Sequence, residues 1–193
     1  MVAMADPLDT VEFDSAEAFE AWLDSHHATS PGVWLRLRKK APGVTALDYR
    51  QALDVALCHG WIDGQKRAQD ERHWLQKFGP RTARSRWSKI NRQKAEDLTA
   101  QGRMRPAGLA EVERARADGR WEAAYDSPRT ATVPEDLAAA LAAEPAAQAF
   151  FAGLDAANRY SVLHRVQEAK RPETRARRIE RFVAMLAAGE KLH

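Results

Sequence analysis

The residues best suited to bind or react with a ligand gather between Trp61 and Asn91. Three of the six tryptophans lie in this segment, and no acidic residue occurs from Arg72 to Ala95. The cations of that acid-free run are Arg72, Lys77, Arg81, Arg84, Arg86, Lys89, Arg92 and Lys94. Basic side chains neutralise phosphates, while aromatic rings stack on bases. The pattern therefore predicts a working surface that could hold an anionic ligand, such as a nucleotide or a single-stranded nucleic acid.

The candidate ligand-binding residues of this segment are both aromatic and polar. They are Trp61, Asp63, Lys66, Trp74, Arg81, Arg84, Ser85, Trp87, Ser88 and Asn91. An enzyme could use Asp63 as a base and Arg81 as a clamp for a carboxylate or an oxyanion. Its hydrogen-bonding groups would be Ser85, Ser88 and Asn91. We favour the alternative in which Asp63 pairs with Arg81 and fixes the loop, because no recognised catalytic motif is present.

Two pairs of adjacent residues have side chains that could form a catalytic or metal-binding pair, but helix geometry argues against both. Cys58 and His59 could form a thiolate–imidazole pair, and His26 and His27 could bind a metal. Neighbouring residues on a helix diverge by about 100°, so neither pair would converge on one atom. The sequence therefore predicts a buried structural Cys58, no catalytic residue, no metal site and no cofactor.

Composition narrows the class of protein. The 193 residues carry a formal net charge of only +3, and the single cysteine excludes an intrachain disulfide. No run of about 18 apolar residues suggests a membrane span, and the first residues lack the pattern of a signal peptide. We therefore expect a cytoplasmic protein.

The first half of the chain mixes helical and strand patterns. Ser15 is expected to cap a helix that ends near His26. Apolar and basic residues alternate over residues 33–38, which predicts a strand with a basic outer face. A turn is expected at residues 39–43, since this stretch ends in Pro-Gly.

The segment that follows contains the elements that must position the candidate site. Asp48 and Gln51 form a capping box at the start of a helix that ends before Gly60. Gly64 indicates a tight turn or a bulge, and residues 72–78 have strand character.

Two more helices are expected after this strand, which Gly79-Pro80 should end. Ser85 would cap a helix that ends at Gly102. Its expected buried line is Trp87, Ile90 and Leu98. Pro106 would open a second helix that ends at Gly119, with Leu109 and Val112 facing inward. The spacing of Trp87 and Ile90 is more typical of a core than of an exposed stacking surface.

From Thr132 onward the chain is rich in alanine and helical in pattern. Thr132 and Glu135 suggest a capping box, and Asp155 is suited to cap a later helix. We expect three or four helices over residues 132–189. A second basic cluster there consists of Lys170, Arg171, Arg175, Arg177, Arg178 and Arg181. Glutamates at helical spacing dilute this cluster, which indicates a solvated helix face.

These elements together predict an α+β fold, with a small antiparallel sheet and packed helices followed by an all-helical C-terminal module. The predicted domains are a mixed N-terminal domain at residues 1–128 and a helical module at residues 132–193. The sequence leaves open whether the two share one core.

Four stretches resemble the YdeI/OmpD-associated, or bacteriocin-protection, family. They are Gly60-Trp61-Ile62-Asp63-Gly64, Phe78-Gly79-Pro80-Arg81, the stretch SRWSKIN at residues 85–91, and KRPETRARRIERFVAML near the C-terminus. The resemblance covers about residues 10–189. It implies an association with an outer-membrane porin and protection against bacteriocins, and it attaches no reaction or cofactor to the motifs.

The functional prediction follows from this resemblance and from the lack of catalytic motifs. We expect a non-enzymatic binding protein that contributes to tolerance of bacteriocins or envelope stress, acting on an unknown protein or an anionic ligand through residues 61–91. The first alternative is an anion-binding module for nucleic acid or a nucleotide on residues 81–94, although nucleic acid is not favoured. The second alternative is an enzyme with a small pocket around Asp63 and Arg81.

Overall fold

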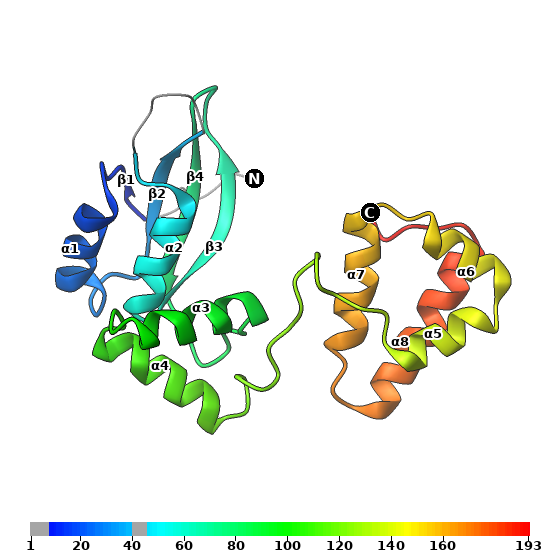
Figure 1. Cartoon of the computed structure of the whole chain (residues 1–193). Coiled ribbons are helices and arrows are strands. Elements are labelled where there is room, and N and C mark those ends of the chain that lie inside the picture. The colour runs from blue at the N-terminus through cyan, green and yellow to red at the C-terminus, as the bar shows by residue number, and fades with distance from the viewer. Residues whose placement is uncertain (1–7, 40–45) are drawn as a thin grey trace. The chain divides into compact units, whose positions relative to one another are not determined.

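The computed structural model of the chain describes residues 8–39 and 46–193, and Figure 1 shows its elements. The chain forms two compact units. The first contains residues 1–87 and 91–124, and the second contains residues 88–90 and 125–193. The turn predicted at residues 39–43 lies, except for Lys39, outside the described residues.

The first unit contains a four-stranded sheet in the order β1-β2-β4-β3. The strands are β1 (Thr10–Val11), β2 (Val33–Arg38), β3 (Trp61–Ala68) and β4 (His73–Pro80). Strand β4 pairs antiparallel with both β2 and β3, whereas β1 pairs parallel with β2. The α+β class is confirmed. The sheet is mixed rather than purely antiparallel, because the short β1 lies along β2 in the same direction.

The strand that Gly79-Pro80 was expected to end continues through both residues. Gly79 lies opposite Ile62, and Pro80 lies opposite Trp61. A proline is tolerated there because it is the last residue of the strand, beyond the final β2 pair at Val33.

Helices α1 (Ala16–His26) and α2 (Tyr49–Cys58) begin as predicted. The Ser15 hydroxyl accepts a hydrogen bond from the Ala18 amide at 3.3 Å, and Asp48 and Gln51 form both bonds of a capping box. A single hydrophobic core joins these helices to the sheet. It includes Phe19, Leu23, Leu53, Ala56, Leu57, Val33, Leu35, Leu37 and Phe78.

The opposite face of β2 is less exposed than the alternation predicted. Trp34 is only 2 % exposed. The Arg67 guanidinium lies 4.2 Å from the centre of the Trp34 ring, so one of the cations of this face covers an aromatic side chain.

Helix α3 (Lys89–Ala100) begins later than predicted. The Ser85 hydroxyl accepts a hydrogen bond from the Thr82 amide at 2.9 Å and so closes a turn instead of capping the helix. Trp87 and Leu98 are buried as expected, but Ile90 is 48 % exposed. The prediction for Ile90 was wrong because the helix starts only one residue before it.

Helix α4 (Pro106–Ala117) packs against the C-terminal end of α2. The Arg105 amide donates to the Cys58 carbonyl at 3.0 Å. A Cβ atom on Gly108 would lie 2.3 Å from the same oxygen, so only glycine permits this approach. Val112 is buried as predicted, whereas Leu109 is 41 % exposed and does not face inward.

The second unit contains four helices among the described residues. They are α5 (Glu135–Ala142), α6 (Pro145–Ala152), α7 (Ala156–Gln167) and α8 (Pro172–Ala187). Helix α8 contacts the other three. Their shared core consists of Leu137, Leu141, Ala147, Phe151, Val162, Leu163, Val166, Ile179, Phe182 and Leu186.

The caps of these helices were predicted in part. The Asp155 carboxylate accepts from the Asn158 amide at 2.8 Å and caps α7 as expected. The capping box expected at Thr132 and Glu135 does not form, because the residue at the N-cap of α5 is Pro134, whose side chain makes no capping bond.

Within the part of the chain that the structure describes, no helix is long and apolar enough to cross a membrane.

Candidate functional site

Three of the predicted site residues, Asp63, Lys66 and Trp74, lie on the face of β3 and β4 that turns toward the core. The pairing of the two strands shifts register between Asp63 and Lys66. The Gln76 side chain donates to the carbonyls of Gly64 at 2.9 Å and Gln65 at 3.2 Å. The irregularity expected at Gly64 is therefore a β-bulge held by Gln76, and a bulge re-aims the side chains beside it.

Tyr49, at the start of α2, completes this group. Its hydroxyl donates to the Asp63 carboxylate at 2.9 Å, and its ring centre lies 6.0 Å from that of Trp74. The Lys66 ammonium lies 4.4 Å from the centre of the Trp74 ring. The result is an aromatic surface flanked by one carboxylate and one ammonium. Such a surface could contact a small polar ligand, but the carboxylate already has a partner.

Arg81 belongs to a different place. It is 5 % exposed, its guanidinium lies 3.6 Å from the centre of the Trp87 ring, and it donates to the Arg86 carbonyl at 3.2 Å. Trp87 is itself only 2 % exposed. Asp63 and Arg81 therefore each have their own contacts, and Trp87 cannot stack on a ligand base without a rearrangement of the core.

Other cations of the acid-free run also make contacts within the protein. Lys94 lies 2.5 Å from Asp54, and Arg92 donates to the Trp121 carbonyl at 3.3 Å. Within the second unit, Lys89 lies 2.7 Å from Asp126. Much of the positive charge that the run displays in sequence is thus neutralised or used in structural hydrogen bonds.

The remaining predicted residues are dispersed. Trp61 is 1 % exposed, and its indole donates to the His27 carbonyl at 3.0 Å. Arg84 is exposed in the turn closed by Ser85. Ser88 forms an isolated bridge with Tyr125, and Asn91 is half-buried in the first turn of α3. The structure therefore does not gather the ten candidates into one site.

The two pairs of adjacent residues have structural contacts. Burial raises the pKa of the Cys58 thiol to about 11, so the thiolate is disfavoured. His26 and His27 each contact a carbonyl of their own helix through Nδ1, at 2.8 and 2.9 Å. The described residues contain no group of three or more His, Cys, Asp or Glu side chains that could hold a metal ion.

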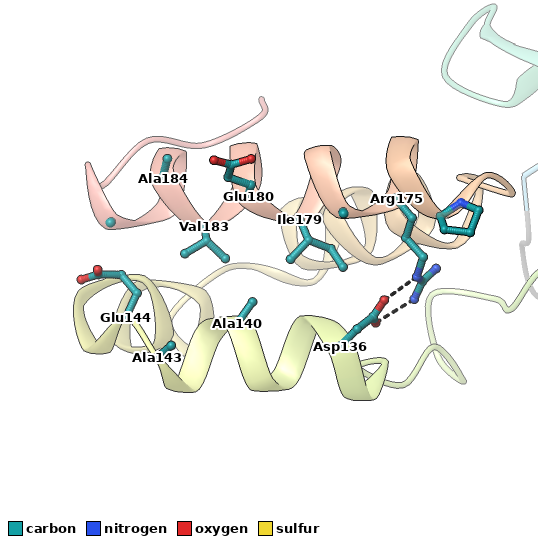
Figure 2. A pocket seen from close by; sticks show the side chains of 12 residues that line it. Asp136, Ala140, Ala143, Glu144, Arg175, Ile179, Glu180, Val183 and Ala184 are labelled. Carbon is teal, nitrogen blue, oxygen red and sulfur yellow. Dashed lines mark hydrogen bonds and ion pairs between the residues drawn. The ribbon is translucent and has the colours of Figure 1, made fainter.

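The second unit contains an apolar groove between α5 and α8, about 760 Å³ in volume (Figure 2). Ile179 and Val183 of α8 point into it (Figure 2). Small side chains line the rest of its length: Ala140 and Ala143 near α5, and Ala176, Ala184 and Ala187 on α8. A groove with methyl walls and little polar surface favours an apolar ligand or a protein segment.

The two halves of this groove differ in charge (Figure 2). In one half, Arg175 donates two hydrogen bonds to Asp136, at 2.5 and 2.9 Å. This pairing lowers the pKa of the Asp136 carboxyl and neutralises both groups. Glu144 lies at the opposite end and Glu180 near the middle of the groove, and neither forms an ion pair within the described residues.

Sequence reasoning missed the groove. The signal that could have revealed it is a second apolar stripe on α8. Ala176, Val183 and Ala187 follow one another at spacings of seven and four residues, beside the core stripe that contains Phe182 and Leu186. When a helix has more apolar surface than its contact with the core covers, the remaining apolar face is available to bind another molecule.

Comparisons with known proteins give two family matches. Residues 11–111, just over half of the chain, match the model of a domain of unknown function (DUF8412). Residues 130–189 match the family described as Bacteriocin-protection, YdeI or OmpD-Associated, which confirms that resemblance for the helical module. The motifs at residues 60–91 fall inside the first match. No curated protein and no solved structure matched the chain.

Proposed function

The chain belongs to the family of the domain of unknown function DUF8412, and we propose that it is a cytoplasmic binding protein that contributes to tolerance of bacteriocins or envelope stress without catalysing a reaction. The match of residues 130–189 to the bacteriocin-protection family supports the biological setting. The groove of the same helical module supports binding as the mode of action.

The observation that carries the proposal is the apolar groove between α5 and α8. Its volume of about 760 Å³ falls in the range of ligand sites, and its walls are mainly alanine and branched aliphatic side chains. Exposed apolar surface that forms a continuous depression is typical of an interaction site, because burying it releases ordered water.

Binding of an anion by residues 81–94 has less support than binding in the groove. Lys89, Arg92 and Lys94 already contact groups of the protein, and Trp87 is buried. A phosphate would have to compete with these internal partners. An enzyme built on Asp63 and Arg81 is disfavoured for the same reason, since their contacts are to Tyr49 and to Trp87.

The proposal can be tested by filling the groove. Ala143 and Ala184 line it and are exposed, so Ala143→Arg with Ala184→Arg should block it without disturbing the core. Ala139→Arg is the matched control, because Ala139 is exposed on the same helix as Ala140 but does not line the groove. Arginine is a good helix former, so none of these changes should unfold the module.

The assay is survival of a bacteriocin-sensitive bacterial host that expresses the chain. We expect the wild type and the control to raise survival, and the blocked variant to lose this effect. Full protection by the blocked variant would show that the groove is not the working surface. No protection by the wild type would remove the stress-tolerance role itself.

A further inference from the structure

The groove has the length and walls of a site for a helix. Ala176 and Ala187 are eleven positions apart on α8, which corresponds to about 16 Å at the rise of an α-helix. This is about three helical turns. Alanine walls let the backbone of another helix approach closely, because their side chains end at Cβ.

A helix fits this surface better than an extended segment does. An extended peptide must pair its backbone N–H and C=O groups with a sheet edge. The groove offers the methyl and methylene groups of Ala140, Ile179 and Val183, with no such edge. A helix satisfies its own backbone and can present a purely apolar stripe to these side chains.

The charge of the groove indicates where the partner carries cations. Asp136 is neutralised by Arg175, whereas Glu144 and Glu180 have no ion-pair partner among the described residues. Arg177 and Arg181 lie near Glu180 in sequence but do not line the groove. The Asp136 end of the site is therefore electrically neutral, whereas its middle and its Glu144 end each carry one negative charge.

The central position of Glu180 argues against a second copy of the chain as the occupant. The apolar stripe from Ala176 to Ala187 is centred within two residues of Glu180. If two copies of α8 packed around a two-fold axis at that centre, their Glu180 carboxylates would face each other. Like charges at the centre of an interface disfavour the pairing.

Building on the proposed binding function, we propose that the groove receives a helix of a partner protein. This helix presents an apolar stripe about three turns long, a Lys or Arg opposite Glu180 near the middle of the groove, and a second one opposite Glu144 at its end. The apolar stripe provides affinity, and the cation opposite Glu144 fixes the direction in which the helix lies.

The probe is a displayed library of helical 18-residue peptides that combine a fixed small apolar stripe with Lys, Glu or Gln at the flanking positions. Peptides are selected on the full chain, and their affinities are then measured by fluorescence anisotropy. The test variant is Glu144→Lys with Glu180→Lys. The control is Glu173→Lys with Glu190→Lys, which changes the net charge equally at exposed residues outside the groove.

We expect the selected peptides to be enriched in Lys or Arg on one side. The test variant should bind them about tenfold more weakly at low salt, and the difference should shrink as salt rises. The control variant should bind like the wild type. Ala143→Arg with Ala184→Arg should abolish binding altogether.

The remaining outcomes test separately whether the groove is a docking site and whether its partner is a cationic helix. If the blocked variant loses binding while the charge-reversed variant keeps it, the groove stands as a docking site and the cationic partner is refuted. If the blocked variant still binds, the peptides do not use the groove. A library that yields no binder refutes a helical occupant, and the survival assay then decides the proposed function on its own. Self-association that Ala184→Arg abolishes, seen by sedimentation, would identify a second copy as the occupant.

Discussion

The contact between α4 and α2 makes a quantitative prediction for Gly108→Ala. A methyl group at this position would lie 2.3 Å from the Cys58 carbonyl oxygen and 2.8 Å from the Leu57 carbonyl oxygen. Both atoms belong to the backbone and cannot rotate away, so α4 would have to move outward. Val112 and Ala115, which lie one and two turns further along the same face, would lose part of their packing.

The expected loss combines two opposing effects. Alanine in place of glycine inside a helix stabilises it by about 1 kcal/mol. Overpacking against atoms that cannot yield costs about 3 kcal/mol, the upper end of the usual range. The net effect is a loss of about 2 kcal/mol in the free energy of unfolding of the first unit. With a urea dependence of about 2 kcal/mol per molar, the midpoint should fall by about 1 M.

Tryptophan fluorescence is the appropriate assay, because all six tryptophans lie in residues 1–124 and report on the first unit alone. The control is Gly64→Ala, whose new methyl group would make only ordinary contacts of 3.7 Å with the Lys77 side chain. Its midpoint should change little. If Gly108→Ala unfolds at the same urea concentration as the wild type or at a higher one, the close approach of α4 to Cys58 is refuted.

Three further predictions concern single side chains. The Cys58 thiol should react with a maleimide at pH 8 only once the first unit unfolds, since burial raises its pKa to about 11; rapid labelling of the folded protein would contradict this. For Asp70, burial raises the pKa, but hydrogen bonds from the Arg72 and His73 amides outweigh it and leave a pKa of about 2. A carboxyl whose pKa is lower in the folded than in the unfolded protein stabilises the fold at a pH above its unfolded pKa of about 4, and this stabilisation is lost as the pH falls to about 2. The urea midpoints of the wild type and Asp70→Asn should therefore differ at pH 6 and converge near pH 2. Asp155→Ala should cost the helical module about 1 kcal/mol through loss of the α7 cap, measured by circular dichroism; an unchanged transition would show that the cap contributes nothing.

Local signals in the sequence predicted much of the fold. Ser15, Asp48 and Asp155 were identified as caps because each can reach an amide two or three residues ahead, and this chemistry does not depend on distant parts of the chain. Ser85 has the same local character, yet its hydroxyl closes a turn with Thr82. A helix cap accepts from an amide that follows it in the chain, whereas Ser85 accepts from an amide three residues before it. Both bonds join a serine hydroxyl to a nearby backbone amide, so sequence alone cannot separate the two outcomes.

The candidate site was harder to predict because a cation can be neutralised by an acidic residue that is distant in the sequence but adjacent in the folded protein. The run from Arg72 to Ala95 contains no acid, but Lys94 is neutralised by Asp54, which lies 40 residues earlier. Lys89 is likewise paired with Asp126 from beyond the run. The pairing of α5 with α8 could not be predicted for the same reason, since the groove exists only where helices distant in sequence meet.

That separation also determines when the groove can exist during synthesis of the chain. Its two walls come from the first and the last helix of the module, α5 at Glu135–Ala142 and α8 at Pro172–Ala187. A ribosome completes α5, α6 and α7 before it makes the other wall. A nascent chain therefore cannot bind the proposed partner helix until α8 has emerged and folded back, so translation itself would delay such binding until both walls are present.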